Sequence, residues 1–198
     1  ITQEDNNSDC FDDEYNLPKN LKIVKLPKFG LKNYPIYLSM RKSIESFNPD
    51  ILYLKGLWRH TSIESYIWKK LHPEKILIVS PSGMLQPKAI ENKKILKLIS
   101  IFLIEHKLFK VCDLLQCVSI LEKNHLLGSK FKFKKVICVP EGLPKIKYKP
   151  KKKKNFTKEL VSISRIDPIK GIDILLEACK DLEFNGWKIT IYGNGSKE

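Results

Sequence analysis

The sequence lacks the cysteine and histidine spacings that a disulfide framework or a structural zinc site requires. Its five cysteines are an odd number, are scattered and include no Cys-x-x-Cys pair: Cys10, Cys112, Cys117, Cys138 and Cys179. Its four histidines form no pair at metal-binding spacing. Zinc sites and small disulfide-rich domains depend on such closely spaced ligands. We therefore expect small buried thiols in a reducing compartment, with no metal ion and no other cofactor.

The chain also lacks a long hydrophobic run and a secretory signal. The longest apolar run, Leu98 to Ile104, is far shorter than the roughly 20 residues that a membrane-spanning helix needs. The N-terminal residues are polar and acidic, whereas a secretory signal combines basic residues with an apolar stretch. We therefore expect a cytoplasmic protein.

Acidic residues are scarce relative to basic ones, with 22 Asp and Glu against 36 Lys and Arg and a net charge of +14. Residues 4–14 hold six acids and no base, whereas residues 145–154 hold seven lysines and no acid. A basic surface favours anionic partners, which include nucleic acids, anionic membranes and phosphorylated small molecules. Because aromatic residues do not interleave with the basic ones and no nucleic-acid-binding motif is present, we expect no nucleic-acid partner.

Short apolar segments alternate with amphipathic ones from about Leu21 onward. Continuous apolar strands between helices are typical of a parallel sheet with helices on both faces. Strands are predicted at Leu21–Leu26, Asp50–Leu54, Lys75–Ser80, Leu114–Val118, Val136–Val139, Leu160–Ser164 and Trp187–Tyr192. Helices are predicted at Tyr34–Phe47, Ser62–Lys70, Pro87–Lys110, Ser119–Leu127 and Gly171–Leu182. Ser119 and Glu122 form a predicted capping box.

A Lys- and Pro-rich stretch over residues 145–156 shows no packing pattern and is predicted to be a linker. It separates an α/β domain over residues 1–144 from the start of a second one over residues 157–198. The first residue is Ile1 rather than Met, and the last residues follow a predicted strand in a predicted loop. We therefore interpret the chain as a fragment that lacks both ends.

The segment Ser164-Arg165-Ile166-Asp167-Pro168-Ile169-Lys170-Gly171 lies where a predicted strand passes into a predicted helix. A helix start offers unpaired backbone N–H groups and the positive end of the helix dipole, which favour an anion. Arg165 and Lys170 add a guanidinium and an ammonium group, which suit a pair of phosphates.

Several segments in order resemble glycosyltransferase family 4, whose members have two facing Rossmann-like domains in the GT-B fold. They are Asn48-Pro49-Asp50-Ile51-Leu52, Gly56-Leu57-Trp58, Val79-Ser80-Pro81-Ser82-Gly83-Met84-Leu85-Gln86-Pro87, Ser119-Ile120-Leu121-Glu122, Val139-Pro140-Glu141-Gly142, and Ser164-Arg165 through Lys170-Gly171. The resemblance extends from about Phe47 to Gly195. Its specific parts are Gly-Met-Leu-x-Pro and Arg-x-x-x-x-Lys-Gly.

The resemblance implies a retaining transfer of a sugar from a nucleotide-sugar to an acceptor hydroxyl without a metal ion, in surface polysaccharide or glycolipid synthesis. Arg165, Lys170 and Gly171 then bind the donor diphosphate, and Gly193 and Gly195 line the donor pocket unless they form a plain turn. A lipid-linked acceptor at the inner membrane face would suit the basic charge. The acceptor-side cleft is expected to contain Trp58, Ser82, Gly83, Met84, Glu141 and Gly142, although Trp58 and Met84 could equally be core residues and Ser82 and Gly83 a turn.

The sequence departs from the family pattern in four places. Ser82 stands where relatives often have histidine, and Glu141 stands where they commonly have asparagine. The glycine-rich loop of the first strand has no counterpart, because the first glycine is Gly30. The paired glutamates that hold the donor are expected beyond Glu198. We therefore expect this 198-residue chain alone to have no transferase activity.

Three alternatives remain open. A degenerate, non-catalytic relative that binds a partner or a sugar would explain Ser82 and Glu141. A different nucleotide-sugar enzyme of the same fold, such as an epimerase, would share the architecture. A nucleic-acid-binding protein would use the lysine run Lys151-Lys152-Lys153-Lys154, which could also be a solvated linker that touches anionic lipid.

Overall fold

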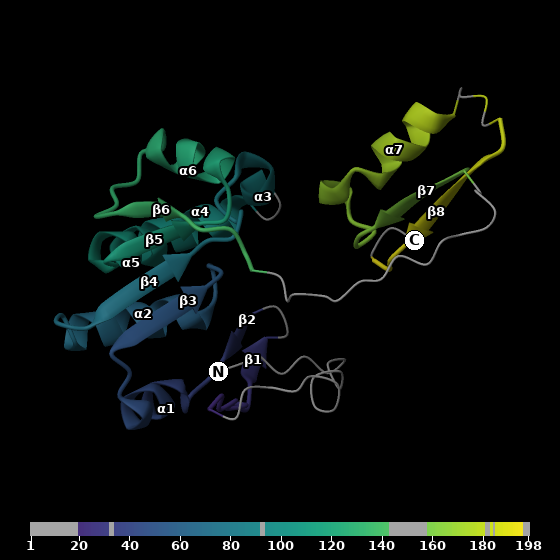
Figure 1. Cartoon of the computed structure of the whole chain (residues 1–198). Coiled ribbons are helices and arrows are strands. Elements are labelled where there is room, and N and C mark those ends of the chain that lie inside the picture. Colours follow the sequence, from purple (N-terminus) through teal and green to yellow (C-terminus); the bar gives the residue numbers. More distant parts are fainter. Residues whose placement is uncertain are drawn as a thin grey trace. The chain divides into compact units, whose positions relative to one another are not determined.

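The computed structural model describes residues 20–31, 34–91, 94–142, 158–180, 183 and 185–195. Contacts between residues divide the chain into two compact units, Ile1–Glu141 and Gly142–Glu198 (Figure 1). We call them unit 1 and unit 2. The predicted linker over residues 145–156 lies outside the described residues.

Unit 1 is built on a four-stranded parallel sheet, as an α/β Rossmann-like fold requires. The strands are β3 (Ile51–Lys55), β4 (Ile76–Ser80), β5 (Leu114–Cys117) and β6 (Val136–Cys138), in the order β3-β4-β5-β6. Tyr53 lies beside Ile78, which lies beside Leu114. Each predicted strand in this region is thus confirmed to within a residue or two.

Helices connect the strands of unit 1 and precede them. They are α1 (Met40–Phe47), α2 (His60–Leu71), α3 (Pro87–Glu91), α4 (Lys94–Ser100), a π-helical segment (Ile101–Glu105), α5 (His106–Val111) and α6 (Ile120–Leu127). The helix predicted over Pro87–Lys110 is helical in all of its described residues, but it contains a π-helical segment between α4 and α5. A π-helical turn widens the helix by one residue, and this change of period is not visible in the apolar pattern.

Two predictions near the start of the described chain are wrong. Leu21–Leu26 forms no strand; only Lys25 has an isolated bridge. The predicted helix Tyr34–Phe47 begins at Met40, because its first part is β2 (Tyr34–Ile36), which pairs antiparallel with β1 (Phe29–Leu31). Pro35 explains the second difference: proline disfavours the helical conformation of the residue before it and cannot donate a backbone hydrogen bond.

Side chains alternate across the sheet, and one face is buried much more than the other. Leu54, Leu77, Val79, Leu115 and Cys117 are at most 6% exposed and form the core with Trp68, Phe109 and their neighbours. On the opposite face Ile51, Tyr53 and Ile76 are exposed. The strands lie in the sheet in the same order as in the sequence. Right-handed crossovers between strands in this order place all the connecting helices on the same face of the sheet. The helices of the described chain accordingly bury one face, where the sequence predicted both.

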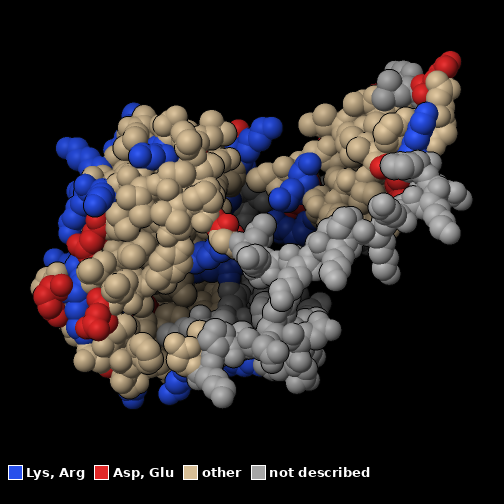
Figure 2. Space-filling view, viewed as in Figure 1, with Lys and Arg blue, Asp and Glu red and all other residues tan. Residues whose placement is uncertain are grey.

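The exposed face is also poor in charge. In Figure 2 the surface over β3–β6 is largely uncharged, and Lys and Arg side chains gather along its margin. The described cysteines, Cys112, Cys117, Cys138 and Cys179, are free thiols, and the first two are buried. Burial raises the pKa of Cys112 to about 12 and that of Cys117 to about 11, which keeps these thiols protonated. Cys10 lies outside the described residues.

Unit 2 is a βαβ unit, as predicted. Strands β7 (Lys158–Ile163) and β8 (Trp187–Tyr192) are parallel, with Leu160 beside Ile189. Between them lie a 3₁₀ turn (Pro168–Lys170) and helix α7 (Ile172–Cys179). Gly171 joins the turn to the helix with φ of +65°, a left-handed conformation that favours glycine.

Candidate functional site

The loops that follow the strands of unit 1 meet at the carboxyl edge of the sheet, where parallel α/β folds bind ligands. Lys55 ends β3, Ser82 follows β4, and Glu141 follows β6. The Lys55 Nζ lies 2.8 Å from Glu141 Oε1, and the Ser82 hydroxyl donates to the same oxygen over 3.5 Å. The fold therefore brings together two predicted residues, Ser82 and Glu141, and a third, Lys55, that sequence reasoning missed.

The ion pair at this edge sets the protonation of its members. The hydrogen bond between the two side chains raises the pKa of Lys55 and lowers the pKa of Glu141, so both are charged at neutral pH. Both side chains are more than half exposed, so water screens the pair. One oxygen of the Glu141 carboxylate therefore lies beside the Ser82 hydroxyl and the Lys55 ammonium group. The charge of Lys55 neutralises the charge of this carboxylate.

The loops after β3 and β4 contain unusual backbone conformations. Trp58 has φ of +60° and Ser82 has φ of +50°, although neither is glycine, and Gly56 and Gly83 have φ of +86° and +80°. Left-handed conformations of non-glycine residues are uncommon, and such strain concentrates at ligand-binding sites. The two loops adopt their shapes because buried side chains hold them.

Glu122 is one of these side chains. Its carboxylate is 2% exposed and accepts the Gly83 N–H over 2.6 Å and the Val118 N–H over 2.8 Å. It thereby joins the loop after β4 to the loop after β5. The predicted capping box is confirmed in one half, since Ser119 Oγ accepts the Glu122 N–H over 3.1 Å. The second hydrogen bond of a capping box, from the backbone N–H of Ser119 to the glutamate side chain, is replaced, because the Glu122 carboxylate accepts from Gly83 and Val118.

Glu105 holds the loop after β3. Its side chain is fully buried at the end of the π-helical segment and accepts the Trp58 N–H over 2.8 Å. Burial raises the pKa of Glu105 to about 7, and the bond from Trp58 only partly offsets this effect. The Lys97 Nζ lies 4.5 Å from the centre of the Trp58 ring, in a cation–π contact. A single acid directly after the apolar run Leu98–Ile104 is the sequence signal that could have revealed Glu105.

The other predicted residues on this edge are placed as follows. Met84 and Trp58 are half-buried and pack against the core, and the Leu57 N–H lies 3.2 Å from the Met84 sulfur. Gly142 is exposed, and a Cβ added to it would meet no atom within 4 Å. Gly142 is the first residue of unit 2, whereas Trp58, Ser82, Gly83, Met84 and Glu141 belong to unit 1.

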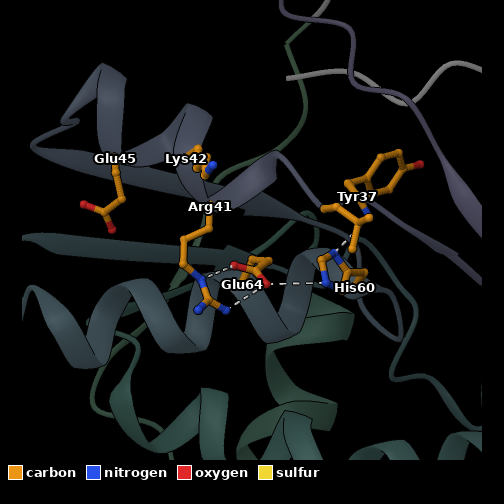
Figure 3. Close-up of a pocket in the computed structure, with 7 residues that line it drawn as sticks. Tyr37, Arg41, Lys42, Glu45, His60 and Glu64 are labelled. Atoms are coloured by element: carbon orange, nitrogen blue, oxygen red, sulfur yellow. Dashed lines mark hydrogen bonds and ion pairs between the residues drawn. The ribbon is translucent and has the colours of Figure 1, made fainter.

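A second polar cluster in unit 1 lies between α1 and α2, away from the predicted residues (Figure 3). Arg41 binds the buried Glu64 through two hydrogen bonds of 2.9 and 3.0 Å, and His60 Nε2 lies 3.4 Å from Glu64 Oε1. His60 Nδ1 accepts the Tyr37 N–H over 3.4 Å. Both ring nitrogens of His60 therefore have partners within this cluster. A cavity of about 490 Å³ beside the cluster is lined by Tyr37, Leu38, Arg41, Lys42, Glu45, His60 and Glu64.

In unit 2, Arg165 and Lys170 are both exposed in the connection from β7 to α7. Asp167 caps the 3₁₀ turn that ends at Lys170, since its Oδ1 accepts the Ile169 N–H over 3.1 Å. Helix α7 then begins without a side-chain cap. The start of α7 is thus preceded by two exposed cations, Lys170 at the end of the 3₁₀ turn and Arg165 before it. An adjacent cavity of about 350 Å³ is lined by Ile166, Asp167, Pro168, Ile172, Asp173 and Leu176, and neither cation is among its lining residues.

Gly193 and Gly195 pack against the same connection. Ile166 N–H donates to Asn194 O over 2.9 Å, and Ser164 N–H donates to Tyr192 O over 3.1 Å, so the pairing of β7 with β8 continues into the loops. A Cβ at Gly193 would overlap the Ser164 carbonyl oxygen, and one at Gly195 would overlap the Ile166 carbonyl oxygen. Close backbone approach is therefore the structural reason for glycine at both positions.

No cluster of three or more His, Cys, Asp or Glu side chains that could hold a metal ion occurs among the residues that the structure describes. No protein-family model matches the chain, and no curated protein is significantly similar to it. The fold and the site thus define the class as a parallel α/β protein with Rossmann-like topology, whose strand-end loops carry the candidate ligand-binding residues.

Proposed function

We propose that the protein is a GT-B-type glycosyltransferase of the retaining class, which transfers a sugar from a nucleotide-sugar to an acceptor hydroxyl. The observation that carries the proposal is the turn from β7 to α7, with Arg165 and Lys170 exposed beside an uncapped helix start. Both cations and the helix dipole act on the charge that develops on a diphosphate leaving group as the glycosidic bond breaks. This arrangement needs no metal ion.

The acceptor side of the proposal rests on the carboxyl edge of unit 1. Trp58 offers an aromatic surface next to backbone held by Glu105, and Ser82 and Gly83 lie on a loop held by Glu122. Sugars pack their apolar faces on aromatic rings and bind hydroxyl and carboxylate groups through hydrogen bonds. Ser82 and Glu141 supply such groups, and Lys55 keeps Glu141 ionised. Surface polysaccharide or glycolipid would be the product class.

One observation favours a second candidate, a non-catalytic relative that binds a partner or a saccharide. Glu141 is already paired with Lys55 and accepts from Ser82, so these groups bind one another at the edge of the sheet. In unit 2, Asp173 in the first turn of α7 opposes an anion at the same helix start. Under this alternative the chain keeps saccharide binding and binds no nucleoside diphosphate.

Calorimetric titration of the full chain with nucleoside diphosphates and nucleotide-sugars tests the proposal. We expect one of these ligands to bind, and we expect Arg165→Ala and Lys170→Ala each to weaken binding by about tenfold or more, since a charge-assisted hydrogen bond contributes about 1.5–3 kcal/mol. Lys188→Ala, an exposed lysine on β8, is the matched control and should leave the affinity unchanged. Equal affinity in all four proteins, or no binding of any diphosphate, would overturn the proposal and favour the second candidate.

A further inference from the structure

Helix α4 is rich in apolar residues, yet none of its side chains is buried. Together with the π-helical segment it presents six large apolar side chains that are 47% to 78% exposed: Ile95, Leu96, Leu98, Ile99, Phe102 and Leu103. Isolated exposed apolar residues are normal on proteins, but a contiguous group of this kind marks an interaction surface. We call these six residues the α4 surface.

The charges around the α4 surface have one sign along most of its length. Lys94 and Lys97 lie within α4, Lys107 and Lys110 follow on α5, and no acid occurs from Lys94 to Ile104. Glu105 comes next, but its carboxyl group is fully buried. Exposed Glu91 on α3 is the acid before this stretch. An anionic partner would therefore meet apolar side chains flanked by lysines.

An apolar helix flanked by lysines is the composition of a segment that lies in the interface of a lipid bilayer. Burial of apolar side chains at the boundary of the acyl chains and attraction of lysines to anionic headgroups act together there. No helix in the described part of the chain is long and apolar enough to cross a membrane. A helix as short as α4 would rest on the bilayer.

We propose that the α4 surface docks on an anionic lipid bilayer, with Ile95, Ile99 and Phe102 entering the interface and Lys94 contacting the headgroups. This inference goes beyond the transferase proposal and does not depend on it, since vesicle binding and nucleotide binding are measured separately. Trp58 lies near this surface, because the Lys97 ammonium group sits over its ring. A bilayer at the α4 surface would thus lie near the loop that we assign to the acceptor side.

Co-sedimentation of the full chain with vesicles tests the proposal. We expect binding to vesicles that contain phosphatidylglycerol and much weaker binding to vesicles of phosphatidylcholine alone. The double variant Ile95→Ser/Phe102→Ser should bind at least about tenfold more weakly, because burying one large apolar side chain accounts for about that factor. Lys94→Gln should weaken binding about fivefold at low salt, as expected for one lysine near an anionic surface.

Matched controls separate docking from misfolding. Ile120→Ser/Leu121→Ser removes two apolar side chains of similar exposure on α6, and Lys130→Gln removes an exposed lysine elsewhere; both should bind vesicles as the original chain does. Phe102→Trp should keep binding and show a blue shift of tryptophan emission and quenching by brominated lipid. Equal binding by the double variant and its control, absence of binding to anionic vesicles, or concentration-dependent dimerisation abolished by Ile95→Ser/Phe102→Ser would each overturn the proposal.

Discussion

At the scale of single residues, two buried glutamates shape the carboxyl edge of unit 1. Glu105 accepts the Trp58 N–H and Glu122 accepts the Gly83 and Val118 N–H groups. The two carboxyl groups differ in their surroundings. Glu122 accepts from two backbone donors, whereas burial of Glu105 outweighs the hydrogen bonds that it accepts and raises its pKa to about 7. Their substitution should therefore change stability in opposite directions.

Glu105→Gln should stabilise the protein above neutral pH. Below about pH 4.5 the glutamate is protonated in both the folded and the unfolded chain, so its titration does not change stability. Between pH 4.5 and 7 the unfolded chain loses this proton while the folded chain keeps it, so the free energy of unfolding falls as pH rises. At pH 8 the glutamine variant should gain on the order of 3 kcal/mol over the original chain, and little at pH 4. Urea denaturation at both pH values measures this difference; exposed Glu91→Gln is the control, and an equal gain at both would contradict it.

Glu122→Ala should destabilise unit 1, because it leaves the half-buried Gly83 and Val118 N–H groups without their acceptor. The expected loss is on the order of 3 kcal/mol, since each unsatisfied buried donor costs about 1–3 kcal/mol. Ser119→Ala, which removes only the cap of α6, should cost about 1 kcal/mol. Denaturation curves at one pH compare the two variants. Equal losses would show that Glu122 acts only as part of the cap.

At the scale of elements, the connection after β7 and the loop after β8 depend on each other. Gly193→Ala and Gly195→Ala should each weaken the pairing of these loops, because the added Cβ would overlap the carbonyl oxygens of Ser164 and Ile166. Overpacking of this kind typically costs about 1–3 kcal/mol. Gly142→Ala, where the Cβ meets open space, is the control. The measurement is hydrogen exchange of the Ile166 N–H, which donates to Asn194; unchanged protection in Gly195→Ala would contradict the expected overlap.

The elements also show how far sequence reasoning reached. Apolar runs in the sequence predicted strands β3 to β8, because a buried parallel strand is apolar over nearly its whole length. Ser119 predicted the start of α6, because serine is a favoured N-cap residue. The prediction was wrong at Pro35, where a local backbone constraint outweighed a helical pattern. It did not foresee the π-helical turn within the helix that it predicted correctly, because such a turn is not visible in the apolar pattern. At the site, loop positions such as Ser82 and Glu141 followed from their place after strands. Lys55 did not, because its partner Glu141 follows β6, a strand that is not a neighbour of β3 in the sheet.

At the scale of the whole molecule, basic residues outnumber acidic ones, and in the view of Figure 2 they gather mainly along the margins of unit 1. We expect the net charge of +14 to give weak, sequence-independent attraction to polyanions. A DNA duplex should therefore bind at low salt and be released at physiological salt, because non-specific binding falls steeply as counterions are added. Fluorescence anisotropy of a labelled duplex across a salt series measures this. Micromolar or tighter binding at physiological salt would support the nucleic-acid alternative.

The sequential order of β3, β4, β5 and β6 has a consequence for how the polypeptide is made. Each strand pairs with the strand that left the ribosome just before it, so β4 can join β3 while β5 and β6 are still unsynthesised. Pairings that close short loops form quickly, and domains generally fold in step with translation. The sheet of unit 1 can therefore form during synthesis from its N-terminal strand to its C-terminal strand, because each new strand pairs with one that has already been synthesised.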